Sequence, residues 1–530
     1  MLAGRRCQSA TGLVGMPPES KMLSSLALSN LFHLQLGLAD LERAPKSLLV
    51  LGIYIVHVLS FGLFTWRISK IRFKWPVAYS AYLTFGYAAF GFYVWAVGYF
   101  WALNRSFFIS STMVWGLFAI VVLIGTHCGT ETVRAVLRAF RAHPVLTFLA
   151  AATILIAMIS GTRGVAFDDD YRWQSAAVWA AAGHWVRSPF RLTNGPAMSE
   201  MLHVPAAVFG NLTAAHWAST GIWVCCALNA AAIARKLQIS AVVGIVSVLS
   251  IPVFTSSGSI LNSDVPAVAF ATAAFVLLLD KEEPGMPPRV LLMAGVLLAA
   301  VLSAKFIVLG CLPGAIAVCV MGTRGTLQDR IVKVCILIAP IFVAGLLWMA
   351  HTYHLTGRPF DPTGKHLVRT PNDPMWHDGQ AVGRIPSARD LLDLPLQPFM
   401  TIFWGQKEPF GGRTGLLWFA LLPAALFLVM TKRVDSWMIQ RRHLLLAVSF
   451  YILLAPIVLK TRFLMFFFIW MALFSATAYE HRHLLPRWAA RTVACLFFIT
   501  ATVGIMDGGR KLLMKVIFDT PPAHPQHQVD

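Results

Sequence analysis

Residues 145–170 read VLTFLAAATILIAMISGTRGVAFDDD, an apolar run that ends at Ser160 and is followed by three consecutive aspartates. The apolar part is long enough to form most of a membrane-spanning helix. A helix leaving a membrane at this point would hold Asp168, Asp169 and Asp170 at the boundary between lipid and water. The rest of the chain is interpreted outward from that boundary.

The composition indicates a membrane protein. Of the 530 residues, 57% are hydrophobic and 13% are charged, whereas a soluble protein carries roughly a quarter charged residues. Repeated apolar runs predict an all-α polytopic membrane protein with about 14 transmembrane spans. The predicted spans are 48–66, 77–102, 108–126, 145–160, 204–234, 240–257, 264–280, 290–303, 306–321, 331–350, 414–431, 444–459, 463–479 and 492–506. We expect 204–234 to begin as a re-entrant piece.

The net charge of +20 is explained by the orientation of the spans. Basic residues favour cytoplasmic turns, whereas a nucleic-acid partner would require them on one soluble domain, and none is visible. The predicted cytoplasmic turns are 67–76, 127–144, 235–239, 281–289, 322–333, 432–443 and 480–491. The long loops 161–203 and 351–413 then lie on the outer side, where we expect them to form a small folded cap.

The sequence predicts four regions. Residues 1–46 form a poorly specified N-terminal segment, and 47–130 hold additional N-terminal spans. Residues 131–480 form the membrane core with both long outer loops, and 481–530 hold the last span and the tail.

Several kinds of site are absent from the sequence. The eight cysteines form no CxxC pair and no Cys/His cluster with zinc spacing, so neither a disulfide framework nor a structural metal is predicted. No Walker A, HExxH or GxSxG motif is present, and no GxGxxG follows a strand. The chain is therefore not interpreted as an ATP-driven machine.

The acidic residues have a structural and a functional interpretation. Asp170 suits the N-cap of a helix that Gly183 would end, and acids in a first turn suit the helix dipole. One acid suffices for a cap, however, and adjacent carboxylates beside lipid should bind protons more tightly than usual. Asp264 similarly begins a span, where it would serve as an N-cap, or as a site residue facing an outer cavity.

Basic residues on the outer side form the next group. Lys305 and Arg462 stand at span ends, where their side chains would either snorkel to the interface or bind an anion such as a lipid phosphate. The loop HLTGRPFDPTGKHLV, residues 354–368, is either a solvated face or a pocket for phosphate or sugar. The residues that could line such a pocket are Arg358, Lys365, His354 and His366, of which Arg358, Lys365 and His366 are the predicted binding residues.

The order of these features resembles the membrane-embedded GT-C glycosyltransferases over about residues 145–480. An acidic pair follows a span, and an interfacial helix then ends in Gly-x-Trp at 183–185. An acid at the next outer turn, a hairpin containing Lys305, a Gly-Arg-Pro-Phe loop and a late Arg-Phe span start come after it. The resemblance is to the branch that includes protein O-mannosyltransferases and lipid A aminoarabinose transferases. The spans at 48–126 fall outside it.

The resemblance implies a GT-C-type helical bundle that moves a sugar from a polyprenyl-phosphate donor to an extracytoplasmic lipid, glycan or protein. It implies that Asp168 is the general base, with Asp169 and Asp264 as further catalytic acids. It also assigns Lys305 and Arg462 to the leaving phosphate. We expect Asp170, Tyr171 and Arg172 to bind substrate as well. The chain departs from this branch at residues 194–205, where NGPAMSEMLHVP replaces a Lys-Pro-Pro-Leu element.

In the mechanism that this resemblance implies, a base takes the proton of the acceptor hydroxyl as its oxygen attacks the anomeric carbon. Direct displacement by this route would invert the anomeric centre. No cofactor is required, although a divalent cation between the carboxylates and phosphate is compatible with them. The expected location is a bacterial inner membrane, with the site on the periplasmic side. Two alternatives remain, a transporter or flippase for a lipid-linked sugar and a non-catalytic assembly subunit.

Overall fold

The computed structural model describes the residues 36–71, 73, 76–124, 134, 137–138, 141–162, 167–188, 196–279, 287–305, 310–323, 325–357, 359, 413–435, 446 and 464–518. The chain divides into two units, Met1–Ser47 and Leu48–Asp530. Helix α2 (Leu36–Ser69) runs across their boundary. Everything below concerns the second unit.

Every regular element of the described residues is a helix, and none of them forms a strand. The elements after α2 are η1 (Pro76–Tyr79), α3 (Ser80–Gly98), α4 (Arg105–Ile124), α6 (Pro144–Ser160), α7 (Phe167–Ala182), α8 (Met198–Met201), α9 (Val204–Val208), α10 (Leu212–Lys236), α11 (Ala241–Leu249), α12 (Pro252–Thr255), α13 (Asp264–Leu279), α14 (Pro288–Ala304), α15 (Leu312–Gly322), α16 (Leu327–Thr356), α19 (Leu417–Met430), α21 (Met465–Glu480), η6 (Arg482–Leu484) and α22 (Arg487–Phe518). The predicted all-α fold class is confirmed.

Four of the described helices are long and apolar enough to cross a membrane, namely Pro45–Ser69, Leu212–Lys236, Leu327–Thr356 and Arg487–Arg510. Most of the other predicted spans correspond to shorter apolar helices. Together with the composition, these helices indicate an integral membrane protein.

Two predicted spans are divided in the structure. The run 204–234 begins as the separate short helix α9 before α10, as expected for a piece that does not cross directly. The prediction of one span over 240–257 is wrong, because α11 ends at Leu249 and a new helix starts at Pro252. Proline lacks the backbone N–H that would continue the first helix. The predicted span 444–459 lies outside the described residues, apart from Leu446.

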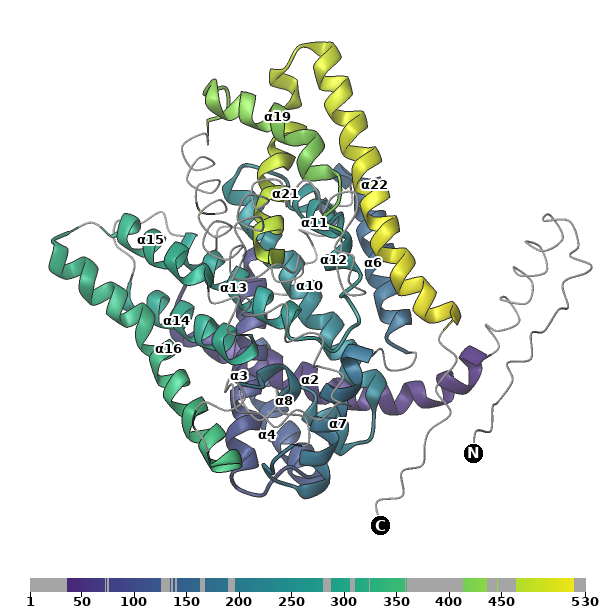
Figure 1. Cartoon of the computed structure of the whole chain (residues 1–530), viewed down its shortest axis with the longest axis vertical. Coiled ribbons are helices and arrows are strands. Elements are labelled where there is room, and N and C mark those ends of the chain that lie inside the picture. The colour runs from purple at the N-terminus through teal and green to yellow at the C-terminus, as the bar shows by residue number, and fades with distance from the viewer. Residues whose placement is uncertain are drawn as a thin grey trace, which may run out of the picture. The chain divides into compact units, whose positions relative to one another are not determined.

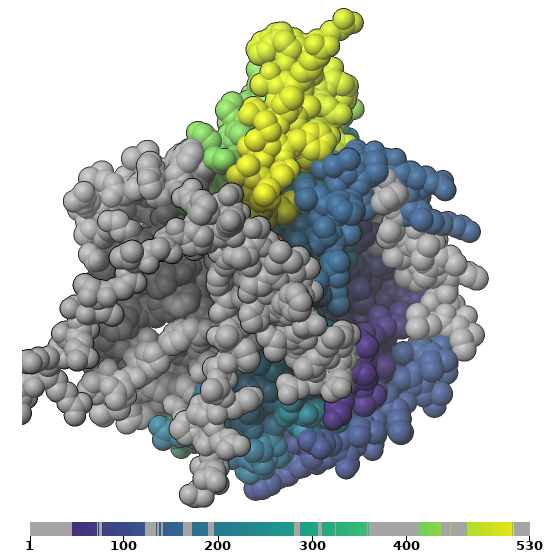
Figure 2. Space-filling view, turned by 90° about the vertical axis from the view of Figure 1, so that its right-hand side faces the viewer, coloured from purple at the N-terminus to yellow at the C-terminus, as the bar shows by residue number. Residues whose placement is uncertain are grey.

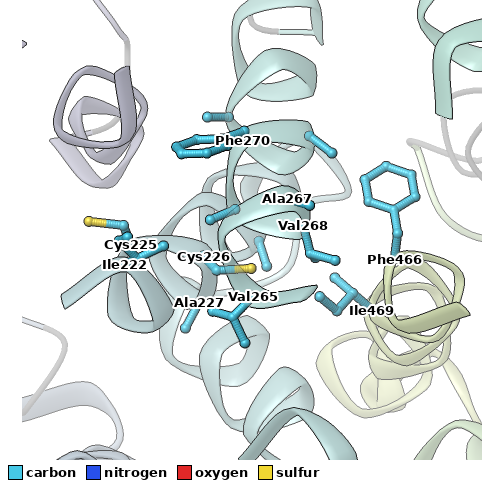
Figure 3. Packing of buried hydrophobic residues seen from close by; sticks show 14 of the residues in the cluster. Ile222, Cys225, Cys226, Ala227, Val265, Ala267, Val268, Phe270, Phe466 and Ile469 are labelled. Carbon is cyan, nitrogen blue, oxygen red and sulfur yellow. The ribbon is translucent and has the colours of Figure 1, made fainter. Parts of the chain in front are cut away.

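Helix α13 lies at the centre of the packing. Every residue from Asp264 to Leu278 is buried, as expected for a helix that is apolar all round. It contacts α3, α10, α14, α15 and α21 (Figure 1). In Figure 3, Val265 and Val268 of α13 lie between Cys226 and Ala227 of α10 and Ile469 of α21. This burial fixes the position of the helix that begins with Asp264.

Other helices expose apolar faces that suit lipid. On α16, Phe342 and Val343 are exposed, and on α22, Ile499, Val503 and Met506 are exposed. Figure 2 shows α22 in yellow at the surface. A contiguous exposed apolar face on a helix of spanning length is expected where lipid tails replace water.

Asn229 of α10 joins three helices by hydrogen bonds. Its Oδ1 accepts from the Ser80 hydroxyl at 2.6 Å, and its Nδ2 donates to Thr84 Oγ1 at 2.9 Å and to the carbonyl of Ala269 at 3.4 Å. These partners lie on α3 and α13. The amide is fully buried, so it aligns α3 with the core.

Two glycines let α3 approach helix α8 and the segment that follows α7. A Cβ at Gly91 would clash with the side chain of Met198 in α8, and one at Gly98 would clash with the indole of Trp185. That indole also donates to the carbonyl of Trp95 at 2.7 Å. Helix α3, from the additional N-terminal spans, therefore supports the segments that carry the candidate site.

Candidate functional site

Helix α7 carries the three aspartates within its first turn, because it begins at Phe167. Asp170 therefore lies inside the helix, and its predicted role as the N-cap is wrong. The prediction that Gly183 ends this helix is confirmed, since Gly183 has a φ of +74° and its N–H donates to the carbonyl of Trp179 at 3.0 Å. A left-handed residue of this kind favours glycine. The backbone of Asp168 to Tyr171 is helical, and their side chains lie outside the description.

Arg172 is the first residue of α7 whose side chain is described, and its guanidinium binds two other segments. It forms an ion pair with Glu200 of α8, and its Nη1 also donates to Ser199 Oγ at 3.1 Å. Its Nη2 donates to Ser263 Oγ at 3.1 Å. The side chains of Arg172 and Glu200 are 11% and 5% exposed, so the pair is shielded from water. The planar fork of arginine suits several acceptors at once.

Asp264 and Lys305 form a second buried ion pair, with side chains 5% and 15% exposed. Asp264 is the first residue of α13, and Lys305 is the C-cap of α14. An anion at a helix N-terminus and a cation at a C-terminus both suit the helix dipoles. The predicted N-cap function of Asp264 belongs instead to Asn262, whose Oδ1 accepts from the N–H of Val265 at 3.0 Å. The carboxylate of Asp264 is thus directed to Lys305.

The turn before Asp264 is held by α6 and α10. Ser259 Oγ and Ser160 Oγ are hydrogen-bonded at 3.0 Å, which ties this turn to the end of α6. His216 Nδ1 donates to the carbonyl of Ser259 at 2.5 Å. Because a carbonyl oxygen only accepts, this contact places a proton on Nδ1. These contacts confirm that the turns after Ser160 and before Asp264 lie on the same side.

The two ion pairs lie close together, because Arg172 binds Ser263, and Ser263 directly precedes Asp264. Asp168 stands four residues before Arg172 on α7, so the two positions lie on one helix face, roughly 6 Å apart along the axis. Of the sequence-predicted site residues, the described contacts therefore bring together Arg172, Asp264 and Lys305. The predicted Arg358, Lys365, His366 and Arg462 lie outside the described residues.

Glu200 and His203 were not predicted as site residues. Their only sequence signal is a carboxylate and an imidazole three residues apart in an otherwise apolar stretch, MSEMLHVP. In the structure His203 lies between α8 and α9 and is buried. Burial, the charge of nearby Arg172 and then that of His216 lower its pKa to about 3. Its ring is therefore neutral at physiological pH.

The arrangement combines two carboxylates, two cations and several hydroxyls from α7, α8, the start of α13 and the end of α14. Shielding from water strengthens the electrostatic effect of such groups on a bound ligand. Within the described ranges, no group of three or more His, Cys, Asp or Glu side chains is arranged to hold a metal ion. A divalent cation between a phosphate and the carboxylates of Asp168 and Asp169 stays a prediction, because these two side chains lie outside the described residues.

No known protein family matches the chain, and no curated protein matches it. Among solved structures, it is similar to ArnT from Cupriavidus metallidurans bound to undecaprenyl phosphate. The TM-score is 0.44 with 11% sequence identity, over 71% of this chain and 76% of that chain. A likeness at this level does not show what this chain does.

Proposed function

We propose that this chain is an integral membrane glycosyltransferase of the GT-C type. It moves a sugar from a polyprenyl-phosphate donor to a lipid, glycan or protein on the outer side of a bacterial inner membrane. The observation that carries the proposal is that the buried pairs Arg172–Glu200 and Asp264–Lys305 lie close together. Arg172 also stands one helical turn after position 168 on α7. Charged groups at membrane-helix ends are costly to bury and often belong to functional sites.

In the proposed reaction, Asp168 takes the proton of the acceptor hydroxyl as its oxygen attacks the anomeric carbon. The bond from that carbon to the phosphate oxygen breaks, and polyprenyl phosphate leaves as an anion. Displacement from the opposite face inverts the anomeric centre. Asp169 orients the acceptor, and Asp264 holds Lys305 in position.

Cations then stabilise the leaving phosphate. Lys305 contributes although it is paired with Asp264, because a phosphate brought beside the pair adds a second acceptor for its ammonium group. Arg358, Lys365, His366 and Arg462 are further proposed phosphate or sugar ligands. Removing one such charge should lower turnover more than it lowers the affinity for the donor, because the charge on the phosphate develops in the transition state.

The test uses the purified full-length protein in lipid nanodiscs with a panel of undecaprenyl-phosphate sugars labelled in the sugar. We expect transfer of label to an envelope extract, and a loss of at least about 10²-fold for Asp168→Asn, because its amide cannot act as the base. The control is Asp435→Asn, an exposed carboxylate after α19, which should retain full transfer.

Two results would contradict the proposal. Full transfer by Asp168→Asn would remove the assignment of the base. Movement of the lipid-linked sugar across vesicle membranes, with no transfer by the wild-type protein, would favour the alternative of a transporter or flippase.

A further inference from the structure

His203 is a buried polar residue whose ring has no hydrogen-bond partner among the described residues. It is 2% exposed, and neither Nδ1 nor Nε2 forms a hydrogen bond with any group in that part of the chain. Its backbone is fully engaged, because the N–H donates to the carbonyl of Glu200 at 2.9 Å and the carbonyl accepts from Ala207 N–H at 3.0 Å. The backbone at this position is therefore fixed, and the buried ring carries two hydrogen-bonding atoms that no described residue uses.

Unpaired polar atoms in a protein interior cost free energy and are rare. A fixed imidazole between two short helices could be replaced by an apolar ring of similar size if packing were its only role. The site around it is polar, since the charges of Arg172 and His216 act on His203 and Glu200 lies one turn earlier. The unused atoms thus stand beside the candidate site and not in the apolar core around α13.

The charge state of the His203 ring favours a sugar hydroxyl over a phosphate as its ligand. The low pKa keeps the imidazole neutral, with one N–H donor and one nitrogen acceptor. A phosphate oxygen would accept from the donor and leave the acceptor unused. A hydroxyl both donates and accepts, and neighbouring hydroxyls of a sugar can engage both sides of the ring. The neutral ring therefore matches a sugar better than it matches a phosphate.

We propose that His203 binds a hydroxyl group of the sugar handled by this site. The inference rests on the proposed glycosyltransferase function and adds to it a residue that recognises sugar. The hydroxyl belongs either to the donor sugar or to the acceptor. Loss of a contact with the donor would weaken binding of the glycosylated lipid, whereas loss of a contact with the acceptor would raise the KM for the acceptor. Ser199 and Glu200, which stand beside Arg172, are positioned by the same short segment.

The experiment compares the wild-type protein with His203→Phe and His203→Asn in nanodiscs. Phe retains the aromatic volume without hydrogen-bonding atoms, and Asn retains a donor and an acceptor. The probes are undecaprenyl phosphate and undecaprenyl-phosphate-linked mannose, glucose, arabinose and 4-aminoarabinose. Equilibrium affinities are measured for each lipid, and KM is measured for an envelope extract as acceptor.

If the hydroxyl belongs to the donor, His203→Phe should weaken binding of the preferred glycosylated lipid about tenfold and leave the bare lipid unchanged. If it belongs to the acceptor, both lipid affinities should hold while the KM for the extract rises about tenfold. In either case His203→Asn should recover part of the loss. A tenfold change corresponds to about 1.4 kcal/mol, the typical size of one hydrogen bond.

The outcomes separate this inference from the proposed function. An active wild-type protein whose His203→Phe variant matches it in every affinity and KM would overturn the role of His203 alone, and would indicate a buried water as the partner of the ring. An equal loss for bare and glycosylated lipid would also overturn it. A wild-type protein that transfers no sugar and binds no glycosylated lipid better than the bare lipid would overturn both.

Discussion

The side chains of Arg172, Glu200, Asp264 and Lys305 show how a charged site is kept within a largely apolar protein. Each cation is buried against a carboxylate, and Arg172 also binds two serine hydroxyls. Taking one member of a buried pair away leaves its partner's charge desolvated, which is more costly than replacing both members. This asymmetry gives a direct test of the pairing.

We expect Lys305→Met to lower the free energy of unfolding by about 3–5 kcal/mol, because the Asp264 carboxylate would remain buried without its cation. The double variant Asp264→Asn/Lys305→Met should be destabilised less than Lys305→Met alone. Unfolding by SDS in mixed micelles measures the two single variants, Lys305→Met and Asp264→Asn, and the double variant.

The exposed substitution Asp435→Asn serves as the control for that experiment, with an expected change within about 0.5 kcal/mol. If the double variant lost the sum of the two single losses, Asp264 and Lys305 would not be coupled.

At the level of the helices, the hydrophobic pattern was sufficient to locate most elements. Apolar runs at 145–160 and 264–280 correspond to α6 and α13 within one residue at each end. The pattern failed at 240–257, where apolar residues continue through the break at Pro252. Hydrophobicity alone does not register a missing backbone donor. A proline does not decide the matter by itself either, because α16 and α19 continue through Pro340 and Pro423.

The candidate site was predicted only in part, because a local sequence pattern does not encode which segments pack against each other. Alternation of spans placed the turns at Ser160, Asp264 and Lys305 on one side, and the contacts among these turns confirm it. The pairing of Arg172 with Glu200 depends on how α8 packs against α7, which no local pattern encodes. The same applies to His203, because its burial is a property of the assembled helices.

Asn229 provides a test of the packing between helices. Asn229→Ala should lower the free energy of unfolding by about 1–3 kcal/mol, because Ser80 and Thr84 would lose an interhelical partner in the interior. Heat or SDS unfolding in detergent measures the loss. Ser247→Ala is the matched control, since among the described residues its hydroxyl donates to the carbonyl of Val243, which lies in its own helix. Equal effects of the two substitutions would argue against a joining role for Asn229.

For the whole molecule, hydrogen bonds join turns that the sequence predicts to lie on the same side of the membrane. Arg433 and the carbonyl of Leu484 are hydrogen-bonded at 3.1 Å, which joins two turns predicted to be cytoplasmic. Arg172 and Ser263 join two segments predicted to be on the outer side. The contacts thus support the grouping of turns, and the assignment of either group to the cytoplasm remains a prediction from charge.

That assignment can be tested with single cysteines in a cysteine-free background. Thr162→Cys, after α6, should react in intact cells with a membrane-impermeant maleimide, because the turn is predicted to face outward. Gln238→Cys, in the basic turn after α10, should react only once the inner membrane is permeabilised. The reverse pattern of labelling would invert the proposed sidedness and place the site in the cytoplasm.

The enclosure of α13 has a consequence for how the protein responds to its bilayer. A thicker or thinner bilayer changes the tilt of helices that touch lipid, and α16 and α22 expose such faces. Every residue of α13 from Asp264 to Leu278 is buried, and its described neighbours include α3, α10, α14, α15 and α21. A change in acyl-chain length should therefore be absorbed at the periphery, and the carboxylate of Asp264 should keep its place while the surrounding helices adjust.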